Sequence, residues 1–358
     1  MRAWASTAHV CGRPPLLVMV TAENAAEFGR PGSGRGEGSA FPQVPLVGLG
    51  ECGTHAVVGV AMGACTTGET TLTRELLASF GPGMVVLADR GFFSVALWNE
   101  AAATGAELVW RTKSNHSLPV DQRLADGSYL SHIQASDDRR NPKHPVVVRV
   151  VEYILDDPGR PQAEDRAYRL VTTILDPDAG PADEVAGLYP QRWEFETVLD
   201  ELKTHQRGPR VVLRSKSPKG VRQEAYGHLC THYAIRALMH TAAADRGVDA
   251  DRVSFTAALH AARRSVRAGL GAATHTLAAA LPATLAEIAD RLLPRRRLRA
   301  AAPVIKRKMS NYGVKRSQHR SWPQPTRSPP QAIGIVANRM CPKHERRRRP
   351  HGHQHGRR

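Results

Sequence analysis

Residues 84–94 read MVVLADRGFFS, in which five apolar residues run into an aspartate, an arginine and a glycine. A fully apolar run this short is typical of a strand that is buried on both faces of a sheet. Asp89 therefore stands at the end of a predicted core strand, and it is also the first aspartate in the chain. If Asp89 holds a metal ion in a catalytic site, other acidic side chains must share that ion with it.

The segments around this strand predict a mixed α/β sheet. Residues 16–20 predict a short strand, residues 44–64 predict two strands that meet near glycines, and residues 71–80 have helical spacing. Residues 107–175 are rich in β-branched and aromatic residues and carry the turn sequences DDRRNP and DDPGRP, which indicates a β-rich insertion. Alanine-rich residues 222–293 predict helices.

We therefore divide the chain into four parts: residues 1–106 as the first part of the core, 107–184 as the β-rich insertion, 185–293 as the remainder of the core with C-terminal helices, and 294–358 as a basic, largely flexible tail. Residues 295–358 hold 19 Lys and Arg and one acid, Glu345, a net charge of +18 against +17 for the whole chain. The rest of the chain is close to neutral, so the total charge alone is weak evidence for a nucleic-acid partner. We expect the tail to add non-specific affinity for DNA.

Composition excludes several classes of protein. A hydrophobic content of 41% is enough for a sizeable core. We expect a cytoplasmic protein, because the sequence has neither a run of about 18 apolar residues nor a secretory signal. Its five cysteines lie far apart and fit neither a zinc module nor a disulfide framework. The motifs GxSxG and GxxxxGKS, which mark serine hydrolases and nucleotide-binding loops, are absent.

Residues 188–203, LYPQRWEFETVLDELK, predict a helix with a polar seam. Pro190 suits the first turn of a helix, where its missing N–H is no loss. At about 100° per residue, Tyr189, Arg192, Glu196 and Lys203 share one arc of about 60° beside the apolar face. The alternative is an ordinary helix in which Arg192 and Glu196 form a solvated i,i+4 pair.

A cationic strip follows this helix. Residues 203–222 contain no acid and seven basic residues. These residues are Lys203, Arg207, Arg210, Arg214, Lys216, Lys219 and Arg222. Such a strip is suited to a polyanionic backbone, which favours a catalytic interpretation of the polar seam.

The spacing Y-x2-R-x3-E-x6-K of the seam residues resembles the signature of a large family of bacterial insertion-sequence transposases with a ribonuclease-H-like D-D-E core. LADRGFF at residues 87–93 is similar to the strand that carries the second aspartate in that family. NAAEFGRPGS, FPQVPLVGLGECGTHAV and KRKMSNYGVKR are also similar to family segments, so the resemblance extends from about residue 23 to about residue 336.

This resemblance implies metal-dependent cleavage and joining of DNA strands. It makes Asp89 and Glu196 the catalytic ligands of Mg²⁺ or Mn²⁺. It assigns DNA contacts to Tyr189, Arg192 and Lys203, and we add Arg207 and Arg210 from the strip. The implied partners are double-stranded DNA, as terminal inverted repeats and as target, and a second copy in a homodimeric synaptic complex. The implied location is the nucleoid, and the implied architecture has a β-rich insertion ahead of the glutamate helix.

One element of the family pattern is missing. The first catalytic aspartate of the family lies in a D-G-T motif about a dozen residues ahead of the asparagine that matches Asn24, where this chain has Cys11-Gly12. Cysteine does not replace a hard oxygen ligand of Mg²⁺. Of the upstream glutamates only Glu51 is expected on a core strand, and it comes too late, so none is an obvious substitute. We therefore expect an N-terminally truncated copy with a damaged first strand and impaired activity. The alternative is a non-catalytic DNA-binding or dimerising remnant.

Overall fold

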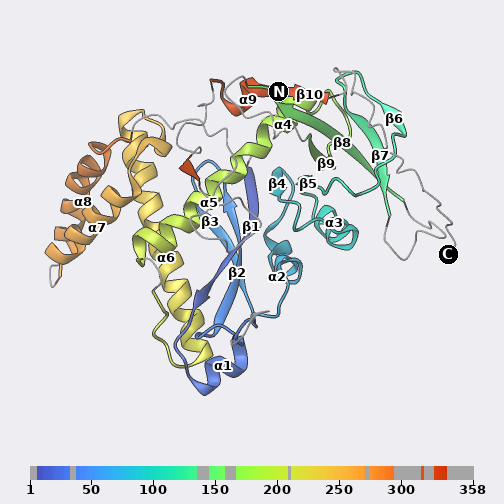
Figure 1. Cartoon of the computed structure of the whole chain (residues 1–358). Coiled ribbons are helices and arrows are strands. Elements are labelled where there is room, and N and C mark those ends of the chain that lie inside the picture. The colour runs from blue at the N-terminus through green and yellow to red at the C-terminus, as the bar shows by residue number, and fades with distance from the viewer. Residues whose placement is uncertain are drawn as a thin grey trace.

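The computed structural model describes residues 6–32, 38–134, 145–157, 167–208, 211–270, 274–293, 316–317 and 326–336 (Figure 1). Its centre is one ten-stranded sheet with the strand order β3-β2-β1-β4-β5-β9-β8-β7-β6, in which β10 pairs with β8. The fold is therefore mixed α/β, as the sequence predicts. None of the described helices is long and apolar enough to cross a membrane.

The first five strands form the half of the sheet that carries Asp89. β1, β4 and β5 run parallel to one another, whereas β2 and β3 are antiparallel to their neighbours. β4 is apolar throughout because both of its faces are covered. The bounds are β1 Ser6–Leu17, β2 Gln43–Glu51, β3 Val57–Met62, β4 Met84–Ala88 and β5 Glu107–Arg111.

The β-rich segment continues the same sheet and does not form a separate one. β9 pairs antiparallel with β5, β8 pairs with β9, and β7 pairs with β8. β5 lies within the predicted insertion, yet it pairs in parallel with β4, so residue 107 is no boundary within the sheet. The bounds are β6 Gln122–Arg123, β7 Tyr129–Ile133, β8 Val146–Leu155 and β9 Tyr168–Thr172.

Helices cover both faces of the sheet. On one face, Leu72 of α2 and Trp98 of α3 pack against β-strand residues such as Val10 and Val86. On the other face, Val185 of α4 and Val198 of α5 pack against strand side chains of opposite orientation. The bounds are α1 Ala22–Phe28, α2 Glu69–Leu76, η1 Leu77–Ser79, α3 Val95–Ala102, α4 Ala182–Leu188, η4 Tyr189–Gln191, α5 Arg192–Asp200, η5 Glu201–Gln206 and α6 Pro218–Arg246.

A small helical module stands at the far end of α6 from its first turn. α7 (Phe255–Ala268) and α8 (Thr274–Ala289) pack against α6 around a core of their own, with η6 (Ala250–Arg252) between α6 and α7. Figure 1 shows this module on one side of the sheet and strands β6–β9 on the other. The alanine-rich region thus forms helices, as predicted.

The described residues of the first strand pair on both sides, although the sequence led us to expect a damaged strand. β1 spans 12 residues and pairs with β2 on one side and with β4 on the other. Ala8 and Val10 are almost fully buried, so this segment satisfies both its backbone hydrogen bonds and its apolar contacts. What β1 lacks near Asp89 is therefore an acidic side chain, and its backbone is in place.

Part of the predicted flexible tail packs on the sheet. The Asp157 carboxylate accepts hydrogen bonds from the backbone N–H groups of Thr326 (2.9 Å) and Arg327 (2.7 Å). Next come α9 (Pro329–Ala332) and β10 (Ile333–Ile335), which pairs antiparallel with β8 beyond the end of β7. Residues 337–358 and most of KRKMSNYGVKR lie outside the described residues.

A buried arginine ties the β-rich segment to the start of α4. Arg149 of β8 is fully buried and forms an ion pair with Asp126. Its guanidinium also donates to Ser128 Oγ (2.8 Å) and to the Gly180 carbonyl (2.6 Å), just ahead of α4. Asp126 in turn accepts the backbone N–H of Ala182 at 2.9 Å. The start of the helical run that carries Tyr189 is therefore fixed by charge-assisted hydrogen bonds.

Candidate active site

Asp89 follows the last residue of β4 and faces the α4–α5 side of the sheet. Its Oδ1 accepts a hydrogen bond from the Tyr189 hydroxyl at 2.9 Å, and its own loop contributes the Arg90 N–H at 2.8 Å. Two arginines lie close by, with Arg192 Nη1 at 3.6 Å from Oδ2 and Arg111 Nη1 at 3.9 Å from Oδ1. Asp89 is thus surrounded by hydrogen-bond donors.

These donors determine the charge state of Asp89. Burial alone would raise the pKa of its carboxyl, but four groups act against burial: the charge of Arg192, the Arg90 N–H, the Tyr189 hydroxyl and the charge of Arg111. Together they hold the pKa of Asp89 below its ordinary value. The group is therefore ionised near neutral pH, as a metal ligand must be.

Tyr189 and Arg192 come from one continuous helical run that begins earlier than predicted. The run starts at Ala182 and passes through a 3-10 turn at η4 before α5, so Pro190 lies inside it. Tyr189 is 1% exposed and Arg192 is 6% exposed, and the Arg192 guanidinium stacks over the Tyr189 ring at 4.8 Å. Arg192 is therefore a buried side chain, and both Tyr189 and Arg192 contact Asp89.

Glu196 and Lys203 follow along the same run. Glu196 lies in α5, one turn after Arg192, and its side chain lies outside what the structure describes. Lys203 lies in η5, a π-helical segment, where the wider turn departs from 100° per residue. Tyr189 and Arg192 thus lie together at Asp89, and the π-helical turn moves Lys203 away from the predicted arc. The place of Glu196 on that arc stays a prediction.

The cationic strip leads away from Asp89 along the continuation of β1. Arg207 is half-buried and donates to the Val211 carbonyl at 2.8 Å, and Arg210 lies outside the described residues. Leu213 forms a parallel bridge with Val18, just beyond β1. The exposed cations that follow are Arg214, Lys216 and Lys219.

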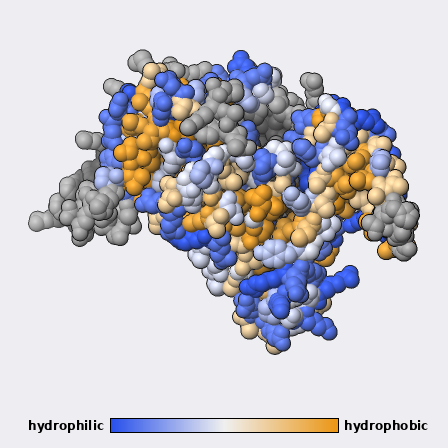
Figure 2. Space-filling view, turned by 180° about the vertical axis from the view of Figure 1, so that it is seen from behind, coloured by the Kyte–Doolittle hydropathy of each residue, from blue (hydrophilic) through white to orange (hydrophobic). Residues whose placement is uncertain are grey.

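The lower end of the molecule, where α1 lies, is mainly hydrophilic. Figure 2 shows this end in blue, whereas apolar residues gather over the middle of the same face and at its two sides. The first turn of α6 lies at this lower end, because the Thr21 hydroxyl donates to the Lys216 carbonyl at 2.8 Å and Asn24 Nδ2 donates to the Ser215 carbonyl at 3.0 Å. The exposed strip cations therefore belong to this hydrophilic end.

Two residues close to Asp89 were missed by sequence reasoning. Arg111 ends β5, and because Ala88 pairs with Trp110, the residues that follow this pair are Asp89 and Arg111. A charged residue at the end of the apolar strand ELVWR was the available signal. Glu69 begins α2, and the charge of Asp89 acts on its carboxyl. In the described ranges no three His, Cys, Asp or Glu side chains are grouped to hold a metal ion.

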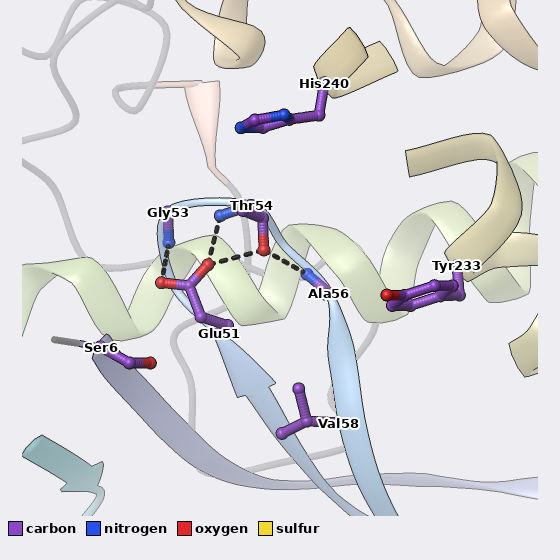
Figure 3. A pocket seen from close by; sticks show the side chains of 8 residues that line it. All are labelled: Ser6, Glu51, Gly53, Thr54, Ala56, Val58, Tyr233 and His240. Atoms are coloured by element: carbon purple, nitrogen blue, oxygen red, sulfur yellow. Dashed lines mark hydrogen bonds between the residues drawn. The ribbon is translucent and has the colours of Figure 1, made fainter. Parts of the chain in front are cut away.

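Glu51 lies at the opposite end of the sheet. It lines an open pocket with Ser6, Gly53, Thr54, Ala56, Val58, Tyr233 and His240 (Figure 3). Ser6 pairs with Met84 at the start of β4, so this pocket is separated from Asp89 by the length of the strand. The Glu51 carboxylate accepts hydrogen bonds from Gly53 N (3.0 Å) and Thr54 N (2.5 Å) in its own turn. Glu51 is therefore a turn residue, and it is not a ligand for a site at Asp89.

The class of this chain is shown by its match to a family model. Residues 6–233 match the model of the family described as "Transposase DDE domain", so the chain belongs to this family.

A curated relative is transposase InsG for insertion sequence element IS4 from Escherichia coli strain K12. It is 27% identical over 303 residues, which cover 82% of this chain and 66% of the relative. This chain therefore matches a little less than two thirds of that protein's length. Among solved structures, the cryo-EM structure of the piggyBac transposase synaptic complex with hairpin DNA is 10% identical, with a TM-score of 0.43, over 82% of this chain and 58% of the other.

Proposed function

We propose that this chain is a DNA transposase that cleaves and joins DNA strands at the ends of an insertion sequence. The observation that carries this proposal is the contact of Tyr189 and Arg192 with Asp89 across 100 residues of sequence. These are the residues of the Y-R-E-K helical run and the LADRGFF strand end, and membership of the transposase family supports the same interpretation.

In this proposal, β1–β5 with α4 and α5 form a ribonuclease-H-like core, and β6–β9 form the insertion. Asp89 and Glu196 would hold divalent metal ions, for which carboxylate oxygens are the preferred donors. A bound Mg²⁺ or Mn²⁺ would activate the attacking water or 3′-hydroxyl and stabilise the leaving oxygen. Tyr189 and Arg192 keep the Asp89 carboxylate ionised and oriented, and this positioning role replaces the predicted phosphate contacts of these two buried residues.

The proposed partners are terminal inverted repeats, target DNA and a second copy of the chain. DNA contacts are assigned to Lys203, Arg207 and Arg210, extended by the exposed cations at the start of α6. The second candidate, a non-catalytic DNA-binding remnant, is favoured by one observation. Continuing the β1–β4 register from the pair Val10–Ala88 places Cys11 beside Asp89, where a two-metal site calls for an acid.

An assay of DNA strand nicking distinguishes a catalytic transposase from a non-catalytic DNA-binding remnant. A terminal-repeat duplex is incubated with Mg²⁺ or Mn²⁺ and with the wild type, Asp89→Ala or Glu196→Ala. We expect metal-dependent nicking by the wild type and at least a roughly hundredfold loss in each variant, because each change removes a metal ligand. Equal nicking rates in all three proteins, together with retained DNA binding, would contradict the catalytic proposal and support the non-catalytic remnant.

A further inference from the structure

A metal site at Asp89 needs a second carboxylate from a neighbouring strand, and β1 has no acidic residue next to Asp89. Its register with β4 places Cys11 level with Asp89, and Gly12 follows. Neither residue has a side-chain oxygen that could bind a hard cation.

The carboxylate of Glu69 reaches the backbone of β1 from α2, the helix on the other face of the sheet. A Cβ built on Gly12 would lie 1.9 Å from Glu69 Oε1, and a Cβ built on Gly91 would lie 3.8 Å from Glu69 Oε2. The carboxylate therefore lies directly against the backbone of β1 and beside the loop that follows Asp89. Any side chain at residue 12 would have to displace it.

The electrostatics agree with this placement. Partial desolvation and the charge of Asp89 both raise the pKa of the Glu69 carboxyl. Two carboxylates this close repel each other, and a divalent cation that both of them bind removes the repulsion. Glu69 remains open to solvent, so an ion can reach it.

We propose that Glu69 supplies the metal-binding carboxylate that β1 does not provide, so that the ligands of the site are Glu69, Asp89 and Glu196. This inference rests on the proposed function and revises the expectation that no upstream glutamate substitutes for the missing aspartate. The plainer alternative is that Glu69 is an acid in the first turn of a helix, where it interacts with the helix dipole.

Metal binding by the full chain tests the inference without reference to catalysis. Mn²⁺ is titrated into the wild type, Glu69→Gln, Asp89→Asn and the control Glu75→Gln, and the free ion is followed by electron paramagnetic resonance. Glu75 is also on α2 and is exposed. We expect at least about tenfold weaker Mn²⁺ binding in Glu69→Gln and Asp89→Asn, and wild-type binding in Glu75→Gln.

A swap of the carboxylate between elements separates ligation from a structural role. In the double variant Gly12→Asp with Glu69→Ala, β1 supplies a carboxylate to the space that Glu69 has left. Gly12 has no positive φ, so an aspartate fits its backbone. We expect the double variant to bind Mn²⁺ more tightly than Glu69→Ala alone, while both unfold at similar temperatures without metal.

The outcomes distinguish this inference from the proposed function. If Asp89→Asn weakens Mn²⁺ binding and Glu69→Gln does not, the inference is overturned and the metal site at Asp89 stands. If the wild type binds no Mn²⁺, or neither variant changes its binding, both proposals fail. Restored binding in the swap variant supports Glu69 as a ligand over Glu69 as a helix-dipole residue.

Discussion

The hydroxyl of Tyr189 is placed to control a carboxylate that is 100 residues away in sequence. It is buried, and burial, acting against the charge of Arg192, raises the pKa of Tyr189 well above its ordinary value. The hydroxyl therefore keeps its proton at every working pH and always donates to Asp89. A donor that stays protonated stabilises the ionised form of the carboxyl more strongly than the protonated form.

Tyr189→Phe tests this contact. We expect its free energy of unfolding at pH 7 to be lower by about 1 kcal/mol, because a hydrogen bond to a charged but partly exposed group is lost. The folded pKa of Asp89 is lowered, so its stabilisation is present above the ordinary value of 3.8 and is lost as pH falls through the lowered pKa. The difference between variant and wild type should therefore shrink in acid.

Urea unfolding at pH 7 and at the lowest pH that keeps both proteins folded measures this difference. Tyr226→Phe is the control, because the Tyr226 side chain is exposed and its hydroxyl donates to the Val60 carbonyl at 3.3 Å. A loss in Tyr189→Phe that is the same at both pH values would show that the hydroxyl does not act through the ionised Asp89.

Sequence alone located Asp89 but not all of its neighbours, for a physical reason. The apolar run before Asp89 is a local signal, and the Y-R-E spacing is local to one helical run. Arg111 and Glu69 reach the site through the pairing of β4 with β5 and through the position of α2. Such non-local placement has no periodicity that a single sequence displays.

At the scale of elements, the sequence predicted the helical run of residues 182–206 but not where it begins or how it ends. Its first turn carries Asp183 and Glu184, acids that favour a helix N-terminus, and this signal predicts an earlier start than Pro190 does. Pro190 is accommodated because it lies in a 3-10 turn. The π-helical end of the run buries Glu201, which contacts α6, and no local pattern in the sequence predicts this turn.

Glu201 links η5 to α6 through a buried network. Its carboxylate contacts His232 Nε2 at 3.0 Å and accepts a hydrogen bond from Arg236 Nε at 3.1 Å. Burial lowers the pKa of His232, against the raising effect of Glu201. Burial would raise the pKa of Glu201, but the hydrogen bond from His232 and the charge of Arg236 lower it overall. His232 is therefore neutral and Glu201 ionised in the folded protein near neutral pH.

His232→Gln tests the pH dependence of this link. A histidine with a lowered folded pKa stabilises the fold fully above its ordinary value of 6.5, and this contribution declines as pH falls below it. The Glu201 contribution is lost only below 4.5. Between pH 7.5 and pH 5.5 we therefore expect the urea midpoint of the wild type to fall more than that of His232→Gln, which keeps a donor but does not titrate.

His240→Gln on the same helix is the control, because His240 is exposed. Its urea midpoint should follow that of the wild type across this pH range. If His232→Gln also follows the wild type, the network does not contribute to the pH dependence of stability.

At the scale of the whole molecule, one continuous sheet contains strands from parts of the chain that we predicted as separate from the sequence. The β-rich segment pairs with the core through β5 and β9, and β10 returns from beyond residue 330 to pair with β8. The segment IGI is too short for a periodic signal, and its pairing depends on the edge that β8 leaves open beyond β7. The sequence therefore indicated which parts are rich in strands and which in helices. It did not indicate which strands of different parts pair.

The location of the proposed DNA contacts is also a question at this scale. Of the exposed cations, Lys219 lies in the first turn of α6, and Arg214 and Lys216 lie just before that helix, whose 29 residues span about 43 Å. Changing all three to Gln should reduce the slope of log affinity against log salt for duplex DNA by up to about 2.7, at about 0.9 for each lost phosphate contact.

The matched control removes the same charge from the other end of α6 and its module, with Arg246, Arg264 and Arg267 changed to Gln. Arg246 pairs with Asp290 at 3.1 Å, and Arg264 pairs with Glu287. We expect the control to keep the wild-type slope, because the proposed phosphate contacts are at the other end of α6. Fluorescence anisotropy at several salt concentrations gives both slopes. An equal reduction in the two variants would mean that the protein binds DNA through its overall charge and has no defined DNA-binding surface.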